Sequence, residues 1–165
     1  SAGILNDTWQ IYLEEMNDTL TEFCEAFDLK LKNYSYPGRG SRIKAEFIEN
    51  GEYCNMYYFE QYGSVEDLSH IRLWKYLNNN YAGIIKNWQN CPLTGVFYDY
   101  EVLRPIAEFM KKTEHITFRD LVNFCFDSFI QAAERQHEDL YSFDFFENEA
   151  EALDLFFTKS GTIYE

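Results

Sequence analysis

The sequence predicts an α+β protein in which several helices pack on a small antiparallel sheet. Two observations lead to this prediction. Apolar residues recur at helical spacing near both ends of the chain, and an Asn-Gly pair in the first third divides two runs of alternating residues. The chain has 165 residues, of which 46% are hydrophobic, so we expect a single domain covering 1–165 with a sizeable core.

A long amphipathic helix is predicted for residues 7–27. Asp7 can cap it, with Gln10 in the capping-box position three residues later. Apolar residues then follow at spacings of four and three, which places them on one helical face: Trp9, Leu13, Met16, Leu20, Phe23 and Phe27. The sequence NYSYPGRG, at 33–40, predicts a loop after this helix.

A central β-hairpin is predicted for residues 43–58. Asn50-Gly51 is a turn sequence typical of type I′ hairpins. Folding about this turn places apolar or aromatic side chains together on one face. The pairs on that face are Phe47 with Cys54, Ala45 with Met56 and Ile43 with Tyr58. The turn and the alternation therefore indicate the same register.

The middle of the chain predicts shorter elements. Ser64 and Asp67 open a second helix that reaches residue 77 and is broken by NNNYAG. Within 84–100, GIIKNWQN is compatible with a further helix and GVFYDY with a strand. A helix over 105–112 is expected to carry Pro105 in its first turn.

The last third predicts a long helix over 118–138, capped by Thr117 with Asp120. Its apolar stripe is Leu121, Phe124, Cys125, Phe129 and Ala132. After a break near Tyr141, FENEAEALDLF predicts a short acidic helix. The tail LFFTKSGTIYE predicts a C-terminal hairpin around Ser160-Gly161.

The charge of the chain excludes several classes of partner. A net charge of −14 opposes direct binding to nucleic acid, which needs Lys and Arg on the phosphates, and it equally opposes binding to anionic membranes. The acids gather at the two ends, because residues 1–28 carry seven acids and no base, and 120–165 carry eleven acids and two bases. Residues 29–48, in contrast, carry five bases and one acid.

The cysteines and the hydropathy pattern bear on the compartment. No apolar run approaches the roughly 20 residues that span a bilayer, and no signal peptide is recognised. The four cysteines form no C-x-x-C pair and lie beside apolar residues. We therefore expect reduced, buried thiols in a cytoplasmic protein.

Enzymatic chemistry has little support in the sequence. The chain has no G-x-S-x-G motif, and Cys125 and His137 lie about 18 Å apart along one predicted helix, too far for a catalytic dyad. A metal site is the alternative that the sequence leaves open. Glu134 with His137, and Asp67 with His70, repeat the Glu-x-x-His type of spacing that di-iron bundles use. The competing interpretation is exposed or partly buried histidines in polar surroundings, and we expect no cofactor.

Two acidic stretches are the candidate partner-binding residues. Glu14, Asp18, Glu22 and Glu25 form one row on the first predicted helix, about 4.5–6 Å apart per step, a separation comparable to that of successive phosphates on a nucleic-acid strand. The second stretch, 137–157, combines carboxylates with Phe residues and contains no Lys or Arg. Its candidates are Glu138, Asp139, Asp144, Glu147, Glu149, Glu151 and Asp154. The alternative for both stretches is a solvated face that only confers solubility.

The tail LDLFFTKSGTIYE and the NNNYAG break, in a small, strongly acidic, aromatic-rich chain, resemble the DNA-mimic inhibitors of phages and mobile elements, including antirestriction proteins. This resemblance implies a non-enzymatic inhibitor that binds a basic protein, such as a nucleic-acid-binding enzyme, and it supplies no catalytic residues. A toxin-neutralising immunity protein is the alternative of the same kind, and a small metal-dependent enzyme is the alternative of a different kind.

Overall fold

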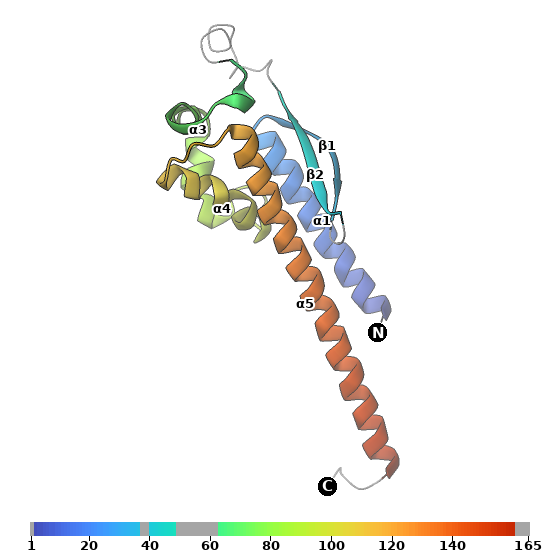
Figure 1. The fold of residues 1–165 in the computed structure, drawn as a ribbon. Helices are drawn as coiled ribbons and strands as arrows, with labels where there is room; N and C mark the ends of the chain where they lie inside the picture. Colours follow the sequence, from blue (N-terminus) through green and yellow to red (C-terminus); the bar gives the residue numbers. More distant parts are fainter. Residues whose placement is uncertain (1, 37–39, 49–62, 161–165) are drawn as a thin grey trace.

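The α+β class is confirmed. The computed structural model describes residues 2–36, 40–48 and 63–160, and within these it describes the side chains from 6 to 142. The described part contains, in chain order, α1 (Ala2–Ala26), β1 (Leu29–Ser35), β2 (Arg42–Phe47), η1 (Val65–Asp67), α3 (His70–Lys86), η2 (Trp88–Asn90), α4 (Tyr98–Lys111) and α5 (Phe118–Ser160). In Figure 1, α1 and α5 lie side by side, with the sheet next to α1 and with α3 and α4 at one end.

The first helix forms as its apolar stripe predicts. Met16, Leu20, Phe23 and Phe27 are buried, and Trp9 and Leu13 pack at the edge of the core. The predicted start is wrong, because α1 begins at Ala2 and Asp7 is an exposed residue inside the helix and not its cap. The stripe fixes which face of α1 is buried, and therefore also which face is left to solvent.

The sheet differs from the prediction in its first strand. Residues 29–35, partly assigned to a loop, form β1, which pairs antiparallel with β2 from Leu29 opposite Phe47 to Ser35 opposite Arg42. Asp28 adopts a left-handed φ of 57°, which ends the helix and turns the chain into β1. The predicted partner strand of β2 and its Asn-Gly turn lie outside the described residues, so the 43–58 hairpin stays a prediction.

The second predicted helix starts later and runs further than expected. Residues 65–67 form a 3-10 turn, and α3 begins at His70. The NNNYAG segment interrupts the helix as predicted, with a kink at Tyr81, whose φ of −131° is not helical, and helical residues resume beyond the kink up to Lys86. The Tyr81 side chain is buried, and its hydroxyl donates a hydrogen bond to the Asp28 carboxylate at 2.8 Å. This tertiary contact holds Tyr81 in place at the kink.

Two predictions about α4 are wrong. GVFYDY is not a strand, since α4 begins at Tyr98, and Pro105 lies in the middle of the helix. Proline has no N–H, so the carbonyl oxygen of Glu101 lacks its usual donor four residues later. The hydroxyl of Ser128, on α5, donates to that oxygen at 2.7 Å. A side chain from the neighbouring helix thus replaces the missing helical bond.

The long helix α5 begins as predicted, with the Asp120 amide donating to the Thr117 hydroxyl at 3.1 Å. Its predicted stripe is buried except for Phe124, which is 48% exposed. The expected break near Tyr141 is absent, and the helix runs through the expected short acidic helix and the first strand of the expected C-terminal hairpin to Ser160. Residues 161–165 lie outside the described part. Figure 1 shows α5 extending well past the N-terminus of α1.

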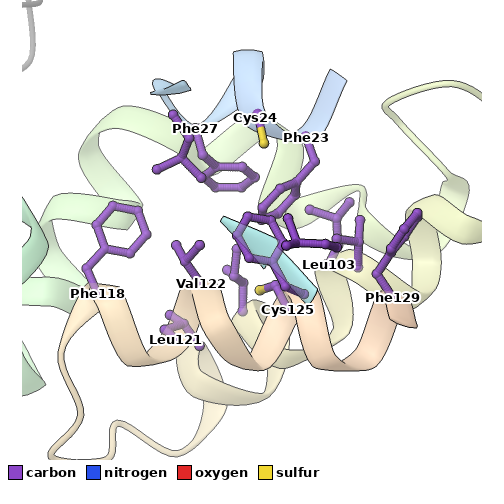
Figure 2. Packing of buried hydrophobic residues seen from close by; sticks show 14 of the residues in the cluster. Phe23, Cys24, Phe27, Leu103, Phe118, Leu121, Val122, Cys125 and Phe129 are labelled. Carbon is purple, nitrogen blue, oxygen red and sulfur yellow. The ribbon is translucent and has the colours of Figure 1, made fainter. Parts of the chain in front are cut away.

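The core is formed where α1, α4 and α5 meet. Figure 2 shows Phe23 and Phe27 of α1 pointing toward the α5 residues Val122 and Cys125, with Leu103 of α4 beside them. The rings of Phe23 and Phe126 meet edge to face at 5.8 Å between centroids. Because α1 faces α5 on this side, the opposite side of α1 points away from the core.

Candidate functional site

The acidic row lies on the solvent side of α1. Glu14, Asp18, Glu22 and Glu25 are all exposed, on the side of the helix opposite Phe23. The row spans about 16 Å along the helix axis at 1.5 Å per residue. Two further exposed residues continue it toward the N-terminus, Asp7 and Ile11. We call these six residues the acidic face: Asp7, Ile11, Glu14, Asp18, Glu22 and Glu25.

The carboxylates of the acidic face are not neutralised by the cations of the described residues. The ion pairs in that part of the chain are Lys32–Glu46, Arg104–Glu101, Arg104–Glu108, Arg119–Glu66, Arg119–Asp67 and Arg135–Glu101. None of them includes an acid of α1. Within the described part of the chain the charge of the face is therefore uncompensated, and its field extends into solvent over about the Debye length of 10 Å at 0.1 M salt.

The second acidic stretch lies elsewhere. Glu138 and Asp139 are exposed on α5, just after His137, whose ring packs edge-on against Trp9 at 4.7 Å. The acids further along α5 belong to the helix, but their side chains lie outside the described residues: Asp144, Glu147, Glu149, Glu151 and Asp154. Because the acidic face points away from α5, the described part of the chain does not place Glu138 and Asp139 on the acidic face.

The residues of the possible metal site have other partners. Asp67 pairs with the Arg119 guanidinium, and His70 stacks on His115 with 3.6 Å between ring centroids. His137 lies between Trp9 and Tyr141, with its ring centroid 4.3 Å from that of Tyr141. Within the described ranges, no group of three or more His, Cys, Asp or Glu could hold a metal ion. The structure therefore does not bring the Glu134–His137 pair and the Asp67–His70 pair together.

Two of the described cysteines, Cys24 and Cys125, do not offer an activated nucleophile. Cys24, Cys91 and Cys125 carry free thiols, while Cys54 lies outside the described residues. Burial raises the pKa of the Cys24 thiol to about 12 and raises the pKa of Cys125 as well. A thiol must ionise to attack or to bind a metal, so these two thiols are unreactive packing residues.

Sequence reasoning missed the buried carboxylate of Asp99. Its Oδ2 accepts hydrogen bonds from the amides of Leu93, Thr94 and Gly95 at 2.9, 2.6 and 3.0 Å. Its Oδ1 accepts from the hydroxyls of Thr94 at 2.7 Å and Thr19 at 3.2 Å. Asp99 thereby fixes the loop before α4 against α1. The sequence shows an Asp shortly after a Thr-Gly pair, which is compatible with a turn closed by the Asp side chain. Nothing near Asp99 in the sequence indicates that Thr19 of α1 also bonds to it.

A second missed carboxylate, Glu101, connects α4 to α5. It is buried and lies 3.4 Å from Arg104 and 3.3 Å from Arg135 of α5. The i, i+3 spacing of Glu101 and Arg104 can be read from the sequence. The contribution of Arg135 cannot, because it depends on how the two helices pack. Both missed acids support the fold and are therefore not candidates for binding a partner.

Comparison with known proteins leaves the function to be inferred from these surfaces. The chain matches no protein-family model, no curated protein and no solved structure. None of the helices in the described ranges is both long enough and apolar enough to cross a membrane.

Proposed function

We propose that this protein is a non-enzymatic binding protein whose acidic face engages a positively charged surface of a partner protein. The observation that supports this proposal is the exposed row of Glu14, Asp18, Glu22 and Glu25, which has no compensating cation among the described residues. The basic partner is a nucleic-acid-binding enzyme, and the carboxylates stand in for phosphates.

Energetic reasoning favours a use for this row beyond solubility. Like charges at i, i+4 on a helix cost about 0.2–0.5 kcal/mol per pair, and the row contains two such pairs, Glu14–Asp18 and Asp18–Glu22. The chain has 14 Lys and Arg residues, and several pair with acids on the sheet, η1 and α4. A surface meant only to be solvated usually mixes both signs. A concentrated field of one sign instead accelerates association with an oppositely charged partner.

Spacing favours a phosphate mimic over a general acidic surface. Successive acids of the row rise by about 4.5–6 Å along the helix, so a protein groove that spaces its cations along a nucleic-acid backbone can meet several of them at once. A toxin-neutralising immunity protein would need the charge without this spacing. The DNA mimic and the immunity protein differ in one measurable respect, because only a DNA mimic must compete with nucleic acid for its partner.

The test is a competition assay. A fluorescent DNA duplex is bound to each of a panel of restriction enzymes and nucleases, and the protein is titrated at low and high salt. We expect displacement from at least one enzyme. A variant with Glu14, Asp18, Glu22 and Glu25 changed to Gln should lose at least tenfold in affinity, chiefly through a slower on-rate, with a flatter salt dependence.

A matched control variant makes the test specific. Glu108, Glu114, Asp120 and Asp127 are exposed acids outside the acidic face, and changing them to Gln or Asn alters the net charge by the same amount. This control should compete nearly as well as the wild type. The row variant should also fold with unchanged or slightly higher thermal stability, because repulsion is relieved. Equal competition by the row variant and the wild type, with the same salt slope, would rule out a role for the α1 acids in binding.

A further inference from the structure

Three aromatic rings form a stacked series at the surface near the start of α4. Trp88 stacks on Tyr100 with 4.6 Å between centroids and 28° between planes. Tyr100 in turn is nearly parallel to Phe97, at 6.0 Å and 14°. Phe97 ends the series and is 58% exposed. We call Trp88, Tyr100 and Phe97 the aromatic ladder.

The aromatic ladder is joined to the helix that carries the acidic face. The Thr94 hydroxyl lies 3.2 Å from the hydroxyl of Thr19 on α1, and both bond to Asp99. Thr94 precedes Phe97 by three residues, so the loop that leads to the ladder is fixed on α1. On that helix Glu15 lies one turn before Thr19. Burial and the negative charge of Glu15 raise the pKa of Tyr98, the residue that follows Phe97.

The ladder is also rigid enough to serve as a binding surface. Three amides of the preceding loop bond to the buried Asp99 carboxylate, and Tyr100 follows Asp99 in the first turn of α4. An exposed ring held in a fixed position loses little conformational entropy when a partner binds. Rings of this kind commonly supply the main contact energy of an interface.

We propose that the aromatic ladder is an arginine-binding site of the partner interface, in which a guanidinium of the basic partner stacks on Phe97 while a carboxylate of α1 pairs with it. This role rests on the proposed function and deepens it by assigning the chemistry of the contact. Arginine fits better than lysine, because its planar guanidinium stacks on rings and pairs with carboxylates in a fixed fork geometry. A stacked nucleobase fits less well, because the net charge of −14 repels the phosphates attached to it.

The experiment compares labelled deca-arginine and deca-lysine peptides by fluorescence anisotropy. The two probes carry the same charge, so the long-range attraction of the acidic face is the same for both, and the change in their affinity ratio on removing the Phe97 ring measures the stacking. We expect the wild-type protein to bind deca-arginine about two- to fivefold more tightly than deca-lysine, the range typical of one exposed cation–π contact. Phe97→Leu keeps an apolar side chain but removes the ring, and it should lower this affinity ratio at least twofold.

Two further variants separate the possible outcomes. Phe124→Leu changes an exposed phenylalanine on α5 and should keep the preference. The four-residue Gln variant of the α1 row should weaken both peptides alike and leave their ratio unchanged. Equal wild-type affinities, or an affinity ratio that Phe97→Leu leaves unchanged, would overturn the arginine site. Full peptide affinity in the row variant would instead contradict the proposed function, so the two failures are distinguishable.

Discussion

Replacing Asp99 with Asn should destabilise the protein strongly, although the change is nearly isosteric. One oxygen of Asp99 accepts three amide hydrogen bonds and the other accepts two hydroxyl bonds. The Asn oxygen can keep the three amides if its NH2 group turns to the two hydroxyls, which can rotate and accept. What is lost is the charge on the acceptor of three bonds.

The magnitude follows from this geometry. A hydrogen bond to a charged group contributes about 1.5–3 kcal/mol, against about 0.5–1.5 kcal/mol for a neutral one. Three such bonds lose about 1 kcal/mol each, so Asp99→Asn should cost about 3 kcal/mol. For a chain of this length that loss lowers the melting temperature by about 6–12 °C. Asp99→Ala, which removes the acceptor, should cost more, about 4–5 kcal/mol.

Urea unfolding followed by tryptophan fluorescence measures this loss as a shift of the midpoint at constant slope. Asp127→Asn is the matched control, since Asp127 is an exposed residue on α5 and its change should stay within about 0.5 kcal/mol of the wild type. If Asp99→Asn were as mild as Asp127→Asn, the carboxylate would not be what holds the loop on α1, and the rigidity ascribed to the aromatic ladder would have no basis.

Three more predictions concern the interior. Ser128→Ala should lower the free energy of unfolding by about 1–2 kcal/mol. The loss should be smaller in a Pro105→Ala background, where residue 105 regains its N–H and can bond to the Glu101 carbonyl itself. Equal losses in the two backgrounds of this double-mutant cycle would contradict the idea that the Ser128 hydroxyl replaces the missing N–H. Iodoacetamide at pH 8 should leave Cys24 and Cys125 unmodified in the folded protein and modify both in urea, because burial raises both thiol pKa values; peptide mass mapping reads this directly. Burial, with hydrogen bonds to Tyr76 and Asp28, raises the pKa of Tyr81 above its ordinary 10.0. The stability this residue contributes is therefore fully present below pH 10 and lost as pH rises further, so melting temperatures should fall from about pH 10 upward, and a flat profile to pH 12 would be inconsistent with it.

Local patterns in the sequence predict those elements whose buried face is set by spacing alone. The stripe of α1 and the Thr117 cap of α5 are examples, because a helix period and a hydroxyl three residues before an amide need no knowledge of neighbours. Pro105 and Tyr81 show the limit. The proline favours a helix end and is overruled by a partner far away in the chain, Ser128. The kink that NNNYAG predicts is present at Tyr81, but the hydrogen bond of Tyr81 to Asp28 has no local signal in the sequence.

The candidate site divides in the same way. The exposure of Glu14, Asp18, Glu22 and Glu25 follows from their position opposite the apolar stripe, so the sequence predicts it. The burial of Asp99 and Glu101 could not be predicted, because a carboxylate is buried only where donors from other elements converge on it. Thr19, a donor to Asp99, is 80 residues away, and Arg135 comes from another helix.

Because α5 is 43 residues long, one helix both packs against the core and extends beyond it. Its first half is held by contacts with α1 and α4, while its C-terminal part passes the end of α1 with no other labelled element beside it (Figure 1). In that part helix stability depends on intrinsic propensity, and the segment ENEAEALDL is composed mainly of strong helix formers. Inserting seven residues there would add about 10 Å of reach and turn the tip by only about 20°. The distance between the body and the tip is thus adjustable by whole turns, without any change to the core.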